Sequence, residues 1–331
     1  MVSESISLKD KVVLVTGGTG SFGKKFTETV LANHSPKKLI IFSRDELKQF
    51  EMSQDFNDRR LRFFVGDVRD LDRLRRAMQG VDVVIHAAAM KRVEACEYNP
   101  NEAILTNVIG SRNVIEAALD NGVRKVMALS TDKAVNPANL YGATKLCSEK
   151  LFVQGNSYSA GTSHTILSCV RYGNVVGSRG SVVQIFKQQK QEGTVTVRDP
   201  RMTRFWLSLD QGVAFVIQCL DVMRGGEVFV PKIPSMNIMD LVRAIAPDSE
   251  VDYVGAGPGE KISEVLISED EAREVMDVEH FFIILPSNLK NLQTEIRDQW
   301  PEGKSLEDGF RYASDSNDEW LTVDDLKKIV G

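Results

Sequence analysis

From Lys11 onward, short apolar runs alternate with longer amphipathic stretches, and this alternation limits the folds open to the chain. The apolar runs have the length of β-strands: Val12–Val15, Leu39–Phe42, Leu61–Val65, Val81–His86, Lys125–Leu129 and Thr165–Val170. The stretches between them have helical periodicity: Phe22–Asn33, Asp45–Phe56, Leu71–Met78, Asn101–Asn121 and Leu140–Gln154. Continuous apolar strands joined by helices are typical of buried parallel sheets. The pattern therefore predicts a doubly wound α/β fold, which binds its ligands at the carboxyl ends of the strands.

The regular alternation weakens after about Gly177, where short apolar runs lie among turns marked by proline and glycine. We therefore expect a dinucleotide-binding, Rossmann-like domain in residues 1–176. Residues 177–331 are expected to form mainly a smaller, substrate-binding C-terminal lobe, with boundaries that interleave. The stretch Leu321–Val330 predicts a final helix with Thr322 as its N-cap.

Composition excludes several classes of partner. The 331 residues include 46 acidic and 41 basic ones, which argues against a nucleic-acid partner. No apolar run approaches the roughly 20 residues of a membrane span, and the polar start of the chain is not typical of a targeting peptide. We therefore expect a cytoplasmic protein without a membrane partner. The four cysteines and four histidines show no ligand spacing, so neither a metal site nor a disulfide framework is expected.

A glycine-rich turn follows the first apolar run and leads directly into the first helical stretch. Gly17, Gly20 and Gly23 form the pattern G-x-x-G-x-x-G. Glycine permits the tight turn between strand and helix, and it lets the backbone approach a pyrophosphate at the helix N-terminus. The turn therefore predicts a bound dinucleotide, with these cofactor-binding residues: Gly17, Thr19, Gly20, Ser21, Phe22 and Gly23.

The end of the second run bears on which dinucleotide is bound. An acidic residue there accepts a hydrogen bond from the ribose of NAD, whereas an arginine accommodates the extra phosphate of NADP. Ser43 and Arg44 come first after the strand, and Asp45 can instead cap the next helix. NADP is therefore favoured over NAD. Further residues assigned to the cofactor follow the later strands: Asp67, Val68, Ala87, Ala88, Ala89, Lys91, Tyr141, Lys145 and Asn174.

A group of residues with acid–base chemistry follows the fifth run. Tyr141 and Lys145 are four residues apart at the start of a helix, so they share a face. A lysine ammonium beside a phenol lowers the phenol's pKa and makes it a base for a sugar or alcohol hydroxyl. We expect Tyr141, Lys145 and the nearby Thr131 to be catalytic. The adjacent pair Asp132 and Lys133 suggests further proton transfers, such as those of an elimination.

Together with the glycine-rich turn, the Tyr-x-x-x-Lys pattern resembles the extended short-chain dehydrogenase/reductase superfamily. Four segments are also similar to the inverting UDP-N-acetylglucosamine 4,6-dehydratases: Ser130–Lys150, Arg171–Val182, Met202–Trp206 and Val230–Met236. These enzymes act in bacterial nucleotide-sugar pathways, including the one to pseudaminic acid. The resemblance implies a nucleotide-sugar substrate and a soluble homo-oligomer, dimer-based and possibly hexameric.

The resemblance also implies a mechanism. Tyr141 takes the proton of the sugar 4-hydroxyl while hydride leaves C4 for NADP, and Thr131 steadies that oxygen. Lys133 then removes the C5 proton, and Asp132 protonates the departing 6-hydroxyl. Hydride returns to C6, and reprotonation at C5 from the opposite face inverts that carbon. Lys133 must be neutral for this role, and we expect Lys145, the nicotinamide and burial to lower its pKa.

Residues expected at the nucleotide sugar follow from the same resemblance: Lys91, Thr131, Gly173, Asn174, Ser178, Arg179, Gly180, Ser181 and Arg201. The chain departs from the family in one segment, where Gly257 replaces an arginine that would meet the diphosphate and Ser263 replaces a histidine. Two alternative functions stay open, a nucleotide-sugar 4- or 5-epimerase and a non-catalytic NADP-sensing scaffold. Asp132 and Lys133 favour dehydration, and the retained Tyr141 and Lys145 argue against a scaffold.

Overall fold

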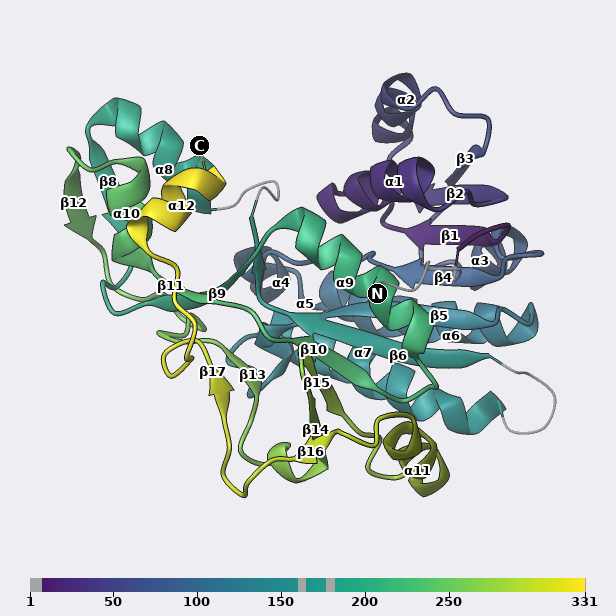
Figure 1. Ribbon diagram of the computed structural model, residues 1–331. Coiled ribbons are helices and arrows are strands. Elements are labelled where there is room, and N and C mark those ends of the chain that lie inside the picture. The colour runs from purple at the N-terminus through teal and green to yellow at the C-terminus, as the bar shows by residue number, and fades with distance from the viewer. Residues whose placement is uncertain (1–7, 160–164, 177–181, 331) are drawn as a thin grey trace.

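The computed structural model describes residues 8–159, 165–176 and 182–330, and it is built on a ten-stranded sheet (Figure 1). The strands of this sheet, in spatial order, are β16 (Lys304–Ser305), β14 (Val275–Val278), β15 (Phe281–Ile284), β10 (Val228–Pro231), β6 (Ile166–Tyr172), β5 (Lys125–Thr131), β4 (Val83–His86), β1 (Val12–Thr16), β2 (Lys38–Ser43) and β3 (Leu61–Val65). From β3 to β10 every neighbouring pair is parallel, and the remaining pairs are antiparallel. The predicted α/β fold with a large parallel sheet is confirmed.

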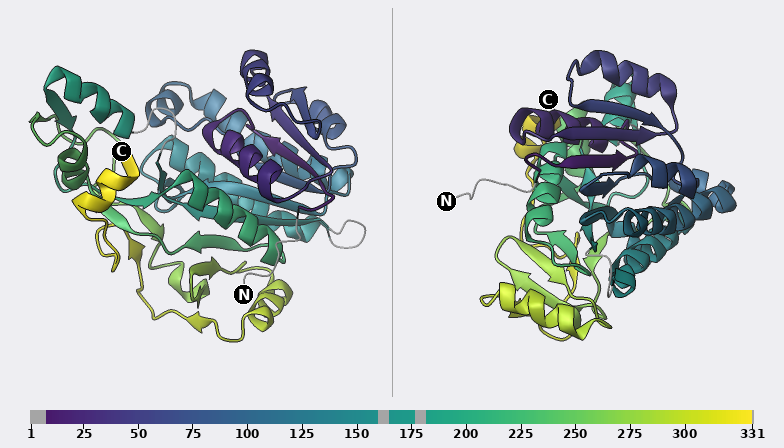
Figure 2. Two further views of the ribbon diagram at one scale, coloured as in Figure 1. Left: turned by 45° about the horizontal axis from the view of Figure 1, so that its top comes forward. Right: turned by 90° about the vertical axis from the view of Figure 1, so that its right-hand side faces the viewer.

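Helices cover both faces of the sheet (Figures 1 and 2). Helices α1 (Ser21–Asn33) and α9 (Leu209–Val222) lie on one face and are joined by an ion pair between Lys25 and Asp210. The other face carries α3 (Leu71–Ala77), α6 (Gly110–Asp120) and α7 (Leu140–Gly155). Helix α2 (Glu46–Asp55) packs beside β2 and β3. Asp45 caps α2 by accepting from the Lys48 amide at 3.0 Å, which confirms the predicted cap.

The stretch expected to form one helix over 101–121 is helical throughout but changes its winding. Helix α5 (Pro100–Ile104) runs into a π-helical turn, Leu105–Ile109, which continues as α6. The buried Asn107 lies in this turn and bonds both backbone groups of Met90 and the hydroxyl of Thr144. The π-helical turn thus ties the loop after β4 to α7, and such turns are frequent at functional sites. The short helix α4 (Val93–Tyr98) precedes it.

A smaller lobe has its own apolar cluster, separate from the core of the sheet. It contains α8 (Val182–Glu192), α10 (Ile238–Ile245), α12 (Val323–Val330), β8 (Thr194–Val197) and β12 (Glu250–Tyr253), seen on the left of Figure 1. Phe186, Leu241 and Leu326 are buried in its cluster. The hydroxyl of Thr322 accepts from the amide of Asp325, as expected for the cap of α12.

The remaining elements lie outside the ten-stranded sheet and outside the lobe named above. They are β7 (Asn174–Val175), β9 (Thr203–Leu207), β11 (Ser235–Asn237), β13 (Val265–Ile267), β17 (Tyr312–Ala313), α11 (Lys290–Gln299) and the 3-10 turns Asp132–Ala134, Asn156–Ser159 and Ala272–Glu274. Residues beyond 176 also return to the main sheet as β10, β14, β15 and β16. In the described parts of the chain no helix combines the length and apolarity needed to cross a membrane.

Candidate active site

The turn between β1 and α1 requires two of its glycines. Gly17 has a φ of 65°, and a Cβ there would lie 2.8 Å from the Cα of Ala88. A Cβ on Gly23 would lie 2.3 Å from the carbonyl oxygen of Gly18. The N-cap of α1 is Gly20, so no side chain of that residue covers the helix N-terminus, and the first turn carries no acidic residue. The turn is therefore open to an anion.

A cavity of about 450 Å³ lies where the parallel strands end. The predicted residues that line it are Gly17, Thr19, Gly20, Ser21, Phe22, Gly23, Ser43, Arg44, Asp67, Val68, Ala87, Ala88, Ala89, Lys91, Thr131, Tyr141, Lys145 and Gly173. The lining residues that sequence analysis did not assign are Phe42, Lys48, Gly66, Thr106, Leu129, Ser130, Tyr172, Val175 and Leu209. Most of these lie within two residues of the carboxyl end of a strand, and that position is the signal that could have found them.

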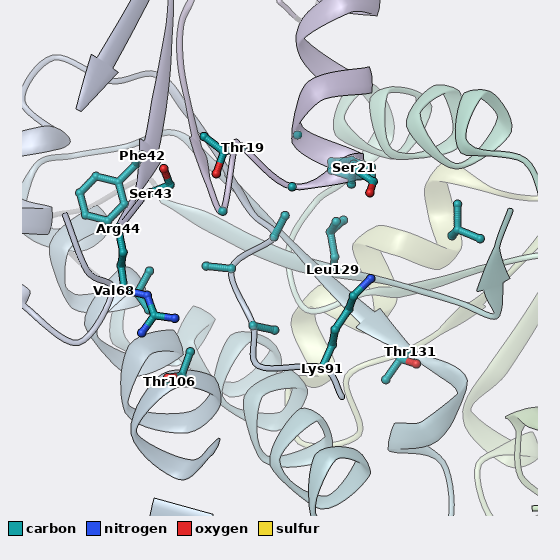
Figure 3. Close-up of a pocket in the computed structure, with 18 of the residues that line it drawn as sticks. Thr19, Ser21, Phe42, Ser43, Arg44, Val68, Lys91, Thr106, Leu129 and Thr131 are labelled. Carbon is teal, nitrogen blue, oxygen red and sulfur yellow. The ribbon is translucent and has the colours of Figure 1, made fainter. Parts of the chain in front are cut away.

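One end of the cavity carries two cations. Arg44 is 59% exposed and lies 3.6 Å from Asp67, on the side of the cavity where Figure 3 shows Phe42 and Val68. Lys48, on the first turn of α2, pairs with Asp45 at 2.6 Å and also lines the cavity. Asp45 pairs with Lys48 and also caps α2, whereas Arg44 is mostly exposed and only loosely paired, so its guanidinium is accessible to an anionic group. The hydroxyl of Ser43 accepts from Gln49.

The loop after β4 brings a further cation into the middle of the cavity. Figure 3 shows Lys91 pointing into it. Burial lowers the pKa of Lys91. Asn107 holds this loop through Met90, the residue before the lysine. Sequence analysis missed Asn107, and its signal is an amide in the middle of an otherwise apolar helical face.

The acid–base residues converge because two short segments meet. Strand β5 ends at Thr131 and turns at once into the 3-10 turn Asp132–Ala134. Helix α7 begins against this turn, and a Cβ on Gly142 would lie 2.1 Å from the carbonyl oxygen of Lys133. Only glycine fits at that position. The contact brings Tyr141, which precedes Gly142, into hydrogen-bond range of Thr131.

The phenol of Tyr141 does not have the lowered pKa that the Tyr-x-x-x-Lys spacing predicts. Burial raises its pKa to about 12, although the charge of Lys133 and the hydrogen bond with Thr131 act in the opposite direction. The amine of Lys145 instead donates to the carbonyl oxygen of Leu129 at 2.7 Å, and burial lowers the pKa of that lysine. In the free protein the group that favours the phenolate is therefore Lys133.

The pKa of Lys133 also differs from the expectation. Burial acts to lower it, but the charges of Asp132 and Glu264 outweigh burial, and the pKa is raised above its ordinary value. The amine of Lys133 lies 3.0 Å from Asp132 Oδ1 and 3.3 Å from Glu264 Oε1. Lys145 is not among the groups that shift this pKa. The free protein thus holds Lys133 as an ammonium ion.

Glu264 is the residue of this group that sequence analysis did not assign. Its side chain is 3% exposed and comes from the C-terminal part of the chain, directly before β13. The signal for it is an acidic residue at the head of the apolar run Val265–Ile267, because an isolated carboxylate is rarely buried without a partner.

The residues beyond 173 that were predicted to bind the substrate differ in how the structure places them. Ser178, Arg179, Gly180 and Ser181 lie outside the described residues. The amide oxygen of Asn174 is buried and has no hydrogen-bond partner among the described residues. Arg201 is not among the described residues that line the cavity, and its guanidinium pairs with Asp199 at 2.7 Å. Its role at the substrate stays a prediction.

Arg198 lies near the segment that departs from the family pattern. The Gly257 amide donates to Glu260, and the same carboxylate oxygen lies 3.6 Å from Arg198. The Ser263 hydroxyl, where a histidine was expected, accepts from Arg311. Arginines from other segments therefore stand beside both altered positions.

A buried charge cluster lies behind the acid–base residues. Arg171 on β6 is fully buried and pairs with Glu149 on α7 and with Glu271 beyond β13. Ser130, next to Thr131, donates to Glu149 at 2.8 Å. The cluster joins β5, β6, α7 and the C-terminal region in one network.

Comparison with known proteins fits this arrangement. Residues 13–286 match the family model described as "Polysaccharide biosynthesis protein". The chain belongs to this family. A polysaccharide biosynthesis relative from Campylobacter jejuni subsp. jejuni serotype O:23/36 (strain 81-176), named UDP-N-acetylglucosamine 4,6-dehydratase (inverting), is 52% identical over 97% of each chain. A UDP-glucose 4-epimerase from Rickettsia felis is 42% identical over 83% of each chain. The X-ray structure of Pen from Bacillus thuringiensis superposes with a TM-score of 0.88, at 38% identity over 98% of each chain.

Proposed function

We propose that the chain is a configuration-inverting UDP-N-acetylglucosamine 4,6-dehydratase. Its product would be UDP-2-acetamido-2,6-dideoxy-β-L-arabino-hexos-4-ulose, an intermediate of the kind used on the route to pseudaminic acid. The observation that carries the proposal is the adjacent Asp132–Lys133 pair, which acts on the phenol of Tyr141, a residue that lines the cavity. An enzyme that only oxidises an alcohol or epimerises C4 needs no second acid–base pair. The 52% identity to a relative of that name supports the same conclusion.

The described residues fit a nicotinamide dinucleotide. Added Cβ atoms on Gly17 and Gly23 would fill the space in which the backbone approaches a diphosphate, and the helix N-terminus beside them is open. Arg44 and Lys48 would meet the extra phosphate of NADP, which is why we propose NADP rather than NAD. When bound, the oxidised nicotinamide would accept hydride from C4 of the sugar, return it to C6 and add positive charge to the site.

The chain's own residues move the protons. Tyr141 takes the proton of the 4-hydroxyl, and Thr131 donates to the same oxygen. The 4-ketone makes the C5 hydrogen acidic, so neutral Lys133 removes it, while Asp132 gives its proton to the departing 6-hydroxyl and water leaves. A proton from solvent then adds to C5 from the opposite face, and Tyr141 releases to solvent the proton that it took from the 4-hydroxyl, so that water is the net loss.

The pair can be reset internally. After elimination Lys133 is an ammonium and Asp132 a carboxylate, and a proton passed across their 3.0 Å contact restores both groups. The second oxygen of Asp132 has no partner among the described residues, and a Cβ on Gly173 would lie 3.5 Å from it. Because Gly173 lines the cavity, the nearness of this oxygen to Gly173 supports our proposal that it faces the sugar.

The substrate would lie beside the cofactor. We propose that Lys91, Thr131, Gly173 and Asn174 contact the nucleotide sugar, together with Ser178, Arg179, Gly180, Ser181 and Arg201. The buried, unpartnered amide oxygen of Asn174 supports its part in this set. A cation near the diphosphate is also needed, and Arg198 is a candidate where Gly257 replaces the expected arginine.

The test is incubation with UDP-N-acetylglucosamine in heavy water, followed by proton NMR. We expect a new C6 methyl signal and deuterium at C5. A sugar epimerised at C4 without a methyl group would instead support the alternative that the Rickettsia felis relative suggests, a nucleotide-sugar 4-epimerase. No conversion of any UDP- or dTDP-sugar would support a non-catalytic scaffold.

Assembly and compartment are further parts of the proposal. Tyr98, Ile104 and Leu105, on α4, α5 and the π-helical turn, are exposed apolar side chains, which supports a dimer-based homo-oligomer. Light scattering of the purified protein would measure its mass. We propose a cytoplasmic location because the nucleotide sugar and NADP are metabolites of that compartment, and cell fractionation would check it.

A further inference from the structure

The carboxyl group of Glu264 faces the acid–base pair from the C-terminal part of the chain. Its Oε1 lies 3.3 Å from the Lys133 amine and 3.9 Å from Arg204 Nε, and its Oε2 is buried without a hydrogen-bond partner among the described residues. A carboxyl oxygen without a donor in a buried site is costly when charged. The placement therefore needs an explanation beyond packing.

The backbone of Glu264 is held rigidly. Its amide donates to the Ser314 hydroxyl at 2.9 Å, and the Ser314 amide donates to its carbonyl at 2.8 Å. The Ser314 hydroxyl also lies 2.8 Å from that of Thr203 on β9, and both are buried. The carboxyl group is thus presented to Lys133 by a framework that does not depend on their ion pair.

Two carboxyl groups face one ammonium in this site. Asp132 Oδ1 accepts from both the Thr131 hydroxyl and the Lys133 amine, whereas Glu264 Oε1 lies 3.3 Å from Lys133 and 3.9 Å from Arg204. The other cations facing Glu264 are engaged elsewhere. Arg204 donates to the carbonyl oxygens of residues 203, 261 and 262, and Lys261 donates to Val135. When two carboxyl groups share a buried site, one of them retains its proton.

We propose that Glu264 is a positioning residue that carries a proton while Lys133 acts as the base. The inference rests on the proposed function. A neutral Glu264 removes one of the two negative charges that hold the proton on Lys133. That proton can then pass over 3.0 Å to Asp132, which gives the neutral amine and the carboxylic acid that the elimination needs, with no change in total proton count.

Burial, and after it the charge of Asp132, raises the pKa of Glu264 above its ordinary value, which fits this role. The sign of the pH dependence follows. As pH rises through the pKa of Glu264, the group ionises and holds the proton on Lys133 more tightly. Dehydration should therefore fall on the alkaline side.

The test compares Glu264→Gln with Glu264→Ala, and uses Glu269→Gln as a control because Glu269 is an exposed residue of the same region. We expect Glu264→Ala to lower kcat by about 10²-fold. Glu264→Gln keeps the shape of a neutral carboxyl group and should be about tenfold faster than the alanine variant. The kcat of Glu264→Gln should also not decrease at alkaline pH, as that of the wild type does. A folded glutamine variant that is no faster than alanine, or that keeps the alkaline fall, would overturn the proposal.

A second measurement separates this inference from the proposed function. Wild-type formation of the C6 methyl group is the positive control, and its absence would count against the dehydratase itself. The protonation of Glu264 is then followed without turnover, in infrared difference spectra of wild type against Glu264→Gln recorded over a range of pH. We expect a protonated-carboxyl band that the variant lacks and that persists to a higher pH than an ordinary glutamic acid allows. A wild-type band that disappears at the ordinary pH, or no such band, would refute the inference.

Discussion

The cavity has two ends that are built in different ways. The cofactor end, formed by Gly17–Gly23, Arg44, Lys48 and Ala87–Lys91, comes from consecutive strand–helix units of the first third of the chain. The sugar end is lined by Thr131 and Tyr141. The residues next to them, Asp132, Lys133 and Glu264, are not among the described residues that line it, and Glu264 comes from far along the chain. Local rules of turn and helix formation are enough to build the first end. The second end exists only when the C-terminal region has folded back onto β5.

The largest expected effect lies at the sugar end. Lys133→Ala removes the base for C5, so dehydration should fall by about 10³-fold. NADP binding should be unchanged, because Lys133 is not among the described residues that line the cavity. Methyl formation by NMR and cofactor titration by fluorescence would measure the two effects. The control is Lys150→Ala, which removes an exposed lysine from α7. Normal turnover of Lys133→Ala would show that Lys133 is not the base.

The next effect lies at the cofactor end. In Gly23→Ala the new methyl group would meet the carbonyl oxygen of Gly18 at 2.3 Å, so the turn must shift. Overpacking of this kind costs about 1–3 kcal/mol, and we expect a lower Tm together with weaker NADP binding. Gly212→Ala in α9 is the control, since its nearest neighbour is a Leu207 methyl group at 3.3 Å. Unchanged NADP affinity would show that the turn tolerates the shift.

A third prediction tests the buried cluster around Arg171, which joins β5, β6 and α7 to the C-terminal region. Arg171 outweighs burial and lowers the pKa of Glu271, so Glu271→Gln should destabilise the protein by about 1–3 kcal/mol at neutral pH. A carboxylate with a depressed pKa contributes stability above its unfolded pKa, and that contribution is lost as pH falls through the folded value. The difference from wild type should therefore shrink in acid. Urea unfolding at several pH values measures it, and a constant difference would contradict this account.

The smallest effect concerns cofactor choice. Arg44 is exposed, so its contribution to binding a phosphate is screened by solvent. We expect Arg44→Ala to weaken NADP relative to NAD by about tenfold, with Lys48 retaining part of the preference. Calorimetric titration of both dinucleotides measures the ratio of the NADP and NAD affinities. Arg59→Ala is the control, because it also removes an exposed arginine. If the ratio of the two affinities is unchanged, Lys48 and not Arg44 accounts for the preference for NADP.

The contrast between the two ends of the cavity also explains which parts of the fold could be predicted from the sequence. The strands, the glycine-rich turn and the Asp45 cap follow local patterns, and the structure has them where those patterns indicate. The sequence predicts that residues 177–331 mainly form a smaller lobe with interleaved boundaries, but it does not indicate which of them join the main sheet. Strands β10 and β15 do so, and pairing between distant strands leaves no periodic signal.

The electrostatics of the site could not be predicted from spacing. The pattern of Tyr141 and Lys145 predicts their shared face but not that Lys145 bonds the Leu129 carbonyl. The raised pKa of Lys133 depends on Glu264, which is 131 residues away in the chain. Such shifts depend on burial and on charges from other segments, and neither is visible in a short motif.

The π-helical turn at Leu105–Ile109 has a consequence for variation in chain length. A turn of this kind holds one more residue than an α-helical turn, which changes the phase of the helix beyond it by about 100°. Deleting a single residue there would let the whole stretch wind as one regular α-helix, and α6 would then present a different face to α3 and α7. A one-residue deletion on a helix surface would thus withdraw Asn107 from Met90 and release the loop that carries Lys91. Length in this segment is as strictly constrained as residue identity.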